Sequence, residues 1–212
     1  MRFGLVEKKL KDKRWLCGLL IISIWPLWPI CSEDKSDANL VLYGGKFTDT
    51  TLLNIVFKQK TDYMDSWLAV AAINYPLEGR LQQFSFETEA QVVQHFGIMK
   101  HTEWNALLIA RWPGFVLSLP FSVALGEGLS VAARKPRLEE WEKDYLAGRK
   151  KSQKSSLVLN YIMLEMDFPL WTDDSAVRGF IRIHHRSGVF GTYCPPTCGS
   201  NFVAYGFKFK LP

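Results

Sequence analysis

The sequence predicts an all-β protein, an eight-stranded antiparallel transmembrane β-barrel, and three observations carry that prediction. From Asn39 onward the chain is a series of short β-rich runs separated by turn residues. Several runs alternate so that one face is wholly apolar: in the last run, Val203 and Tyr205 lie on one face, and Lys208 and Lys210 on the other. No run after residue 31 is long and apolar enough for a transmembrane helix.

Residues 1–31 are predicted to be a signal peptide for export, and residues 32–212 to be the outer-membrane β-barrel domain. The first segment has a basic head, MRFGLVEKKLKDKR, followed by the apolar stretch WLCGLLIISIWPLWPIC. Two prolines, Pro26 and Pro29, interrupt the apolar run and leave it short of the ~20 residues that a membrane-spanning helix needs, which favours a signal peptide. The alternative interpretation of this segment is a helix that anchors the protein in the membrane. Cys31 suggests the possibility of a lipoprotein that is acylated at this residue. The residue before it is large, however, whereas such acylation sites have a small residue there.

Eight strands are expected after the signal. Residues 40–47 and 50–57 count together as one interrupted strand. The other seven strands are expected at residues 66–77, 83–96, 102–112, 119–133, 155–168, 176–187 and 200–211.

The connections between these runs fit a membrane barrel. With both termini on the periplasmic side, LEGRL, PGFVL and PLWTDDS become short periplasmic turns, and the charged stretch at residues 134–154 becomes extracellular. Residues 137–149 within that stretch have helical character. The residues expected to form aromatic girdles near the two membrane interfaces are Trp67, Trp104, Trp112, Trp171 and Tyr205.

The charge and the cysteine content of the chain argue against a nucleic-acid-binding protein and against a cysteine metal site. The net charge is +5, but residues 1–31 carry six basic against two acidic side chains, so the remainder is near +1 and gives no support to nucleic-acid binding. Two cysteines fall in or at the end of the signal. In an exported protein the other two, Cys194 and Cys198 in CPPTC, favour a disulfide over a metal site, because no second ligand pair of suitable spacing exists.

A pair of polar residues interrupts the apolar face of IRIHHRSG, residues 181–188. The face that begins with two isoleucines ends in His185 and Ser187, and on the next strand Asn201 shares the face of Val203. Alternation alone does not tell inside from outside. In a barrel whose apolar face meets lipid, the three polar side chains would turn toward the membrane near its outer rim, where unpaired polar groups are costly. They are therefore candidate functional residues.

The chemistry of the three residue types is compatible with ester hydrolysis. A histidine near neutral pH can take the proton of a serine hydroxyl, and a third group must orient the imidazole, a role that an asparagine carbonyl fills in some cysteine hydrolases. His185 and Ser187 lie roughly 6.6 Å apart along a strand, as neighbours on one face.

The segment HHRSGVFGTYCPPTCGSNFVAYGFKFKLP resembles the last two strands of the outer-membrane lipid A 3-O-deacylases (PagL-type, often labelled acyloxyacyl hydrolase). The resemblance implies His185 as general base, Ser187 as nucleophile, and Asn201 in the position of the family's acidic residue. Known members carry a glutamate where this chain has Asn201 and an asparagine where it has Gly188. The Gly188 N–H is therefore the candidate oxyanion donor.

The function implied by the resemblance is a carboxylic ester hydrolase of the bacterial outer membrane, which removes an ester-linked acyl chain from lipid A of lipopolysaccharide. No metal or organic cofactor is expected, because serine-type ester hydrolysis needs none. The alternative is a non-catalytic outer-membrane barrel with a structural, adhesion or lipid-binding role, and a third possibility is a soluble secreted barrel that binds a small apolar ligand inside. A monomer and a homodimer are both consistent with the sequence.

The other histidines are not assigned to this site. His184 is expected to face inward with Arg182 and Arg186, in a polar network of the lumen. His95 and His101 flank a predicted extracellular loop, and the sequence suggests no partner for either.

Overall fold

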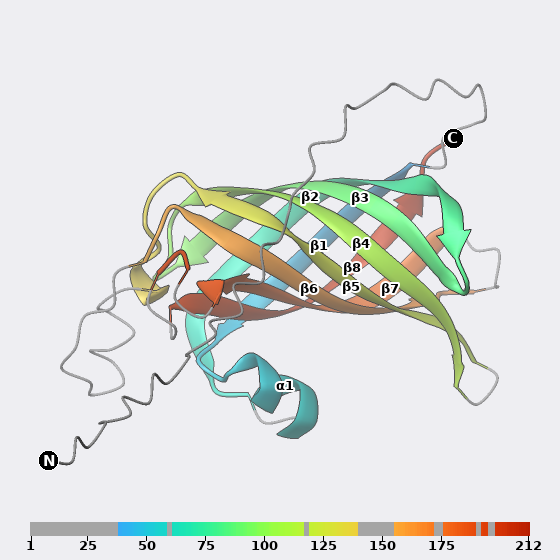
Figure 1. Cartoon of the computed structure of the whole chain (residues 1–212). Coiled ribbons are helices and arrows are strands. Elements are labelled where there is room, and N and C mark those ends of the chain that lie inside the picture. Colours follow the sequence, from blue (N-terminus) through green and yellow to red (C-terminus); the bar gives the residue numbers. More distant parts are fainter. Residues whose placement is uncertain are drawn as a thin grey trace, which may run out of the picture. The chain divides into compact units, whose positions relative to one another are not determined.

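The computed structural model describes residues 38–58, 61–116, 119–139, 155–171, 176–189, 192–194 and 198–212. Their strands form a closed barrel in which each strand pairs antiparallel with the next and the last pairs with the first (Figure 1). The predicted eight-stranded fold is confirmed, while the predicted signal segment lies outside the described residues. The strands are β1 (Asn39–Thr48), β2 (Tyr63–Leu81), β3 (Phe84–Gly97), β4 (Thr102–Val116), β5 (Leu119–Ala132), β6 (Val158–Pro169), β7 (Val177–Ser187) and β8 (Gly199–Lys210).

Residues 50–57 contain a helix rather than part of a strand, so this part of the prediction is wrong. The pairing of β1 with β2 ends at Thr48, and the residues that follow have no neighbouring strand to bond with. Their backbone satisfies its own polar groups instead, and the Ile55 N–H donates to the Thr51 carbonyl at 3.0 Å. The resulting helix, α1 (Leu52–Lys58), lies outside the ring of strands (Figure 1).

The strands turn many large apolar side chains outward, although an apolar cluster that includes Val41, Phe47 and Phe202 is buried inside. On β4, Trp104 and Leu108 are about half exposed, whereas Glu103 and Asn105, on either side of Trp104, are buried. A water-soluble barrel has the reverse pattern, because its apolar side chains fill the interior. The fold is therefore that of a transmembrane barrel. Each strand contributes exposed apolar residues to the outer wall, for example Leu42, Ile73, Val92, Leu108, Leu125, Met166, Ile181 and Phe207.

The aromatic residues predicted to form girdles are all exposed on the described surface. Trp67 and Trp104 lie near the ends of their strands that meet the β1–β2 and β3–β4 links, and Trp112 and Trp171 lie toward the other end. These four occupy two levels, as expected of residues at the two interfaces of a membrane. Tyr205 lies midway along β8, between the two levels.

Charged side chains occupy much of the interior. Arg182 is fully buried and donates hydrogen bonds of 2.6 Å to both Glu89 and Glu165. Arg111 donates at 2.8 Å to Glu165 and to Asp167. Buried charges are tolerated when they are paired in this way. The inward ion-paired set comprises the cations Arg111, Arg178, Arg182, Arg186 and Lys208 and the anions Glu87, Glu89, Glu103, Glu139, Glu165 and Asp167.

The two ends of the barrel differ in their connections. Short links join β2 to β3, β4 to β5 and β6 to β7 at one end. The links β1–β2, β3–β4, β5–β6 and β7–β8 meet at the opposite end, which we call the long-loop end (Figure 1). Of the helix predicted at residues 137–149, the described residues include one 3-10 turn, η1 (Arg137–Glu139).

Among the residues that the structure describes, no helix is both long enough and apolar enough to cross a bilayer.

Candidate active site

Strand β7 carries His185 and Ser187 on its outer face, as the alternation predicts. Arg182, His184 and Arg186 alternate with them and are fully buried inside the barrel. The strand ends at Ser187 and continues into the β7–β8 link, so both outward polar side chains lie at the long-loop end. They therefore sit on the apolar outer wall, close to its rim.

The structure brings His185 and Asn201 into direct contact. The two residues face each other across β7 and β8, and His185 Nδ1 lies 2.6 Å from Asn201 Oδ1. Asn201 is 6% exposed and His185 is partly buried, so this contact is partly shielded from solvent. A short bond in such surroundings holds the imidazole in one orientation.

A second hydrogen bond fixes the direction of the first. The Asn201 side-chain nitrogen donates to the Thr50 main-chain carbonyl at 2.8 Å, and a carbonyl can only accept. The Asn201 oxygen must then face His185, and His185 Nδ1 must carry the proton that it accepts. In the neutral ring this leaves Nε2 as the basic nitrogen, the tautomer that a general base requires.

Thr50 is itself held in place by the link that follows β1. Its N–H donates to Thr48 Oγ1 at 3.1 Å, and its hydroxyl oxygen accepts from the Asp62 N–H at 3.0 Å. Thr48 Oγ1 in turn donates to the Asp62 carbonyl at 3.0 Å. The β1–β2 link thus supports the Asn201–His185 pair, a role that no motif in the sequence revealed.

Ser187 lies on the same face but is not bonded to this pair among the described residues. Its hydroxyl oxygen accepts a hydrogen bond from the Val189 N–H at 3.2 Å. Catalytic hydrogen bonds are often long or misaligned before substrate binds. The structure therefore brings His185 and Asn201 together and places Ser187 two residues away, without a direct bond to His185.

The backbone immediately after Ser187 adopts an unusual conformation. Gly188 is buried, and its carbonyl accepts from the Tyr193 N–H at 3.1 Å. Val189 has a φ of 46°, in the left-handed region that β-branched residues avoid. Such strain costs of order 1–3 kcal/mol and clusters at functional sites. It holds the Val189 N–H toward the Ser187 hydroxyl.

Asn160 is a further polar residue beside Ser187, and no motif in the sequence indicates it. It is the direct cross-strand neighbour of Ser187 on β6. The residues on either side of it, Leu159 and Tyr161, are fully buried inside, so Asn160 faces outward and yet is only 8% exposed. Its amide is therefore a second candidate donor near the Ser187 hydroxyl.

The β7–β8 link is closed by a disulfide between Cys194 and Cys198. Both cysteines are buried and pack with Leu159 of β6. Because Leu159 adjoins Asn160, the disulfide attaches the link that follows Ser187 to the strand that carries its cross-strand neighbour.

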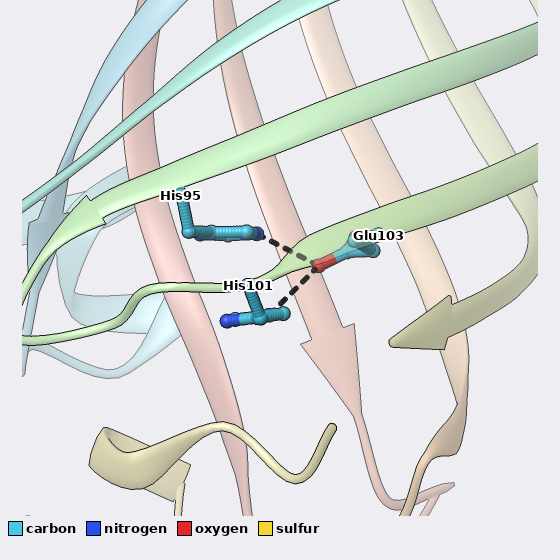
Figure 2. A group of neighbouring side chains, drawn as sticks. All are labelled: His95, His101 and Glu103. Carbon is cyan, nitrogen blue, oxygen red and sulfur yellow. Dashed lines mark hydrogen bonds and ion pairs between the residues drawn. The ribbon is translucent and has the colours of Figure 1, made fainter. Parts of the chain in front are cut away.

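A second group of polar residues lies inside the long-loop end. His95 and His101 stack with ring centroids 4.1 Å apart, and both rings are turned toward the Glu103 carboxylate (Figure 2). The expectation that these two histidines have no partners is wrong, because His95 Nε2 lies 2.9 Å from Glu103 Oε2. His101 lies in the β3–β4 link, and burial, with His95 nearby, lowers its pKa to about 3.

Inward-facing His184 contacts the same carboxylate. Its Nε2 lies 3.2 Å from Glu103 Oε1, and its Nδ1 lies 3.0 Å from the hydroxyls of both Tyr43 and Tyr161. His184 is thus a member of the interior polar network, as the sequence predicts, and is separated from the outer site by the barrel wall.

Comparisons with known proteins add little beyond the fold. No family model matches the chain, and no curated protein matches its sequence. Among solved structures, the crystal structure of Neisserial surface protein A (NspA) is similar over 83% of this chain and 98% of that chain, with a TM-score of 0.47 and 10% sequence identity. This likeness is too distant to carry an argument about function, which must come from the site itself.

Proposed function

We propose that this protein is a serine esterase of the bacterial outer membrane that removes an ester-linked acyl chain from lipid A. The observation that carries the proposal is the His185–Asn201 pair on the apolar outer wall. Its hydrogen-bond directions leave His185 Nε2 basic, two residues from a serine at the membrane rim. The acyl esters of a membrane lipid lie at that depth, between the polar head group and the hydrocarbon.

In the proposed cycle, Ser187 Oγ attacks the acyl carbonyl carbon while its proton passes to His185 Nε2. The bond between the acyl carbon and the sugar oxygen breaks, and His185 returns the proton to that oxygen. Water, deprotonated by His185, then hydrolyses the acyl-enzyme and releases a fatty acid. A rotation about the Ser187 Cα–Cβ bond moves the hydroxyl from Val189 toward His185 at the start of the cycle.

In this proposal, two groups stabilise the negative oxygen of the tetrahedral intermediate. The Gly188 N–H directly follows the nucleophile, and the Asn160 amide lies across from it on β6. Preorganised donors of this kind supply a large part of the rate enhancement in acyl transfer. Asn201 is neutral, so it orients His185 without supplying the charge that an acidic residue would provide.

A non-catalytic barrel is the second candidate function. It is favoured by the Ser187 hydroxyl, whose bonding partner among the described residues is the Val189 N–H and not His185. In this alternative the outward polar residues would contact lipid head groups and would carry out no chemistry.

Mass spectrometry of lipid A separates the two functions. The wild type, Ser187→Ala and Ser200→Ala are expressed in bacteria that lack a lipid A deacylase of their own. Ser200 is the matched control, because it lies at the same end but points inward to Glu139 at 2.6 Å. We expect lipid A to lose one acyl chain in cells with the wild type or Ser200→Ala, and to stay intact with Ser187→Ala.

The location is tested in the same cells by fractionation, with folding checked by the mobility of unheated protein on a gel. Wild-type protein that is folded in the outer membrane and leaves lipid A unchanged would overturn the esterase proposal. Recovery in the soluble periplasm without detergent would overturn the location.

A further inference from the structure

We propose that His95, His101 and Glu103 bind a divalent transition-metal ion of the zinc class inside the long-loop end of the barrel. The three residues come from one short segment, the end of β3, the β3–β4 link and the start of β4. One ligand atom from each lies within 4.8 Å of the others, and all three residues are buried. This site is separate from the outer-wall residues assigned to ester hydrolysis.

The distance between His101 and Glu103 is too long for a hydrogen bond but is close to the distance between two ligands of one metal ion. His101 Nε2 lies 3.9 Å from Glu103 Oε2, too far for a hydrogen bond. Zinc forms bonds of about 2.0–2.2 Å to nitrogen and oxygen, so two ligands of one tetrahedral ion lie about 3.3 Å apart. Because the two imidazole planes are stacked and parallel to within 8°, the His101 ring would rotate out of the stack on binding, so that the ion lies in the plane of each ring.

An unpartnered nitrogen is a second, independent indication. Within the described part of the chain, His101 Nε2 is buried without a hydrogen-bond partner. Native interiors rarely leave such atoms unsatisfied, and each case requires an explanation such as an absent ion. The dashed line between His101 and Glu103 in Figure 2 marks the contact that this nitrogen, Nε2, makes with the carboxylate. A metal ion would satisfy it directly.

The charge balance of the interior points the same way. Among the ion pairs described at this end of the barrel, two buried carboxylates, Glu103 and Glu139, share Arg186. Arg186 lies 3.6 Å from Glu103 and bonds Glu139 through two contacts of 2.9 Å. A buried carboxylate requires compensation, and a divalent ion supplies it.

The donor set selects the class of metal. Two imidazoles and a carboxylate suit zinc, cobalt, nickel or copper, whereas magnesium and calcium prefer oxygen ligands alone. His184 is not one of the three proposed ligands, because its Nε2 contacts Glu103 Oε1 at 3.2 Å, whereas His95 and His101 approach Oε2. It instead holds the carboxylate from the other side, as outer-shell groups commonly do at a metal site.

Metal binding is tested on the full chain, purified in detergent without a polyhistidine tag and stripped with a chelator. Zn²⁺ binding is measured by titration calorimetry, and the coordination by the visible absorption of added Co²⁺. The variants are His101→Ala and Glu103→Gln, and the control is His185→Ala, which removes an imidazole from the outer wall at the same end. Unheated gel mobility establishes that each protein is folded.

We expect one Zn²⁺ per chain in the wild type and in His185→Ala. His101→Ala should weaken Zn²⁺ binding by more than about tenfold. Changing a residue that only supports a metal ligand already costs about tenfold or more in affinity, so the loss of a ligand should cost at least as much. Glu103→Gln, which preserves the side-chain shape, gives the same test if His101→Ala does not fold. Folded wild type that binds no Zn²⁺, or folded variants that bind as tightly as wild type, would overturn the proposal; the charge at Glu103 would then be balanced by a proton.

Discussion

The Asn201 amide donates to the Thr50 carbonyl at 2.8 Å, and this bond turns the Asn201 oxygen toward His185. Asn201→Asp replaces that donor with an acceptor. We expect esterase activity to be preserved or raised, because a carboxylate stabilises an imidazolium better than an amide does. We also expect the unfolding free energy to fall by about 1–3 kcal/mol, because the Thr50 carbonyl loses its partner. Lipid A deacylation rates and urea unfolding in detergent measure the two effects separately.

Asn201→Ala serves as the comparison, since it removes both bonds and should lower both activity and stability. A large loss of activity in Asn201→Asp, in protein that is still folded, would argue that Asn201 acts by another route, such as donating its amide to the oxyanion.

Asn160→Ala tests the polar residue across from Ser187. If its amide donates to the oxyanion, kcat should fall by about 10²–10³ with little change in KM, as when other oxyanion donors are removed. Asn105→Ala is the control, because Asn105 faces inward and donates to Gln91 at 2.9 Å. An unchanged kcat in folded Asn160→Ala would leave the oxyanion to the backbone alone.

Val189→Asn tests the strained backbone after the nucleophile. Asparagine adopts the left-handed conformation more readily than valine, so the substitution should raise the unfolding free energy by about 1 kcal/mol. Val189→Ile keeps the branched side chain and should bring no gain. If Val189→Asn is the less stable of the two in urea unfolding, packing of the valine side chain outweighs its backbone strain.

Arg182→Met tests the interior ion pairs. Removing this fully buried cation leaves Glu89 and Glu165 without a principal partner, and should cost about 3–5 kcal/mol of unfolding free energy. Arg178→Met is the matched control, because its side chain is 29% exposed, and a loss of about 1 kcal/mol is expected there. Equal losses in the two variants would show that burial does not set the strength of these pairs.

The strands and their faces could be predicted from the sequence because both depend on local periodicity. The runs at residues 119–133 and 176–187 match β5 and β7 to within one residue at each end, and alternation along β7 separates His185 from His184. The helix α1 could not be predicted, because a short apolar run does not distinguish helix from strand. The chain forms a helix there because the pairing of β1 with β2 ends at Thr48.

The contacts between distant strands could not be predicted in this way. Asn160 meets Ser187 only through the register of β6 against β7, and a period of two fixes the face of a residue but not its cross-strand partner. His101 lies in a link, where alternation assigns no face at all. Its stacking on His95 therefore had no signal in the sequence.

The fully buried Arg182 and Arg186 have a consequence for the permeability of the membrane. An eight-stranded barrel is just wide enough for side chains to fill it, and here both arginines occupy its interior with no exposed surface. The described strands thus enclose a plug of ion pairs and not an aqueous channel. We therefore expect no passage of solutes through the described part of the barrel, and the outer wall is the surface on which the proposed ester hydrolysis would take place.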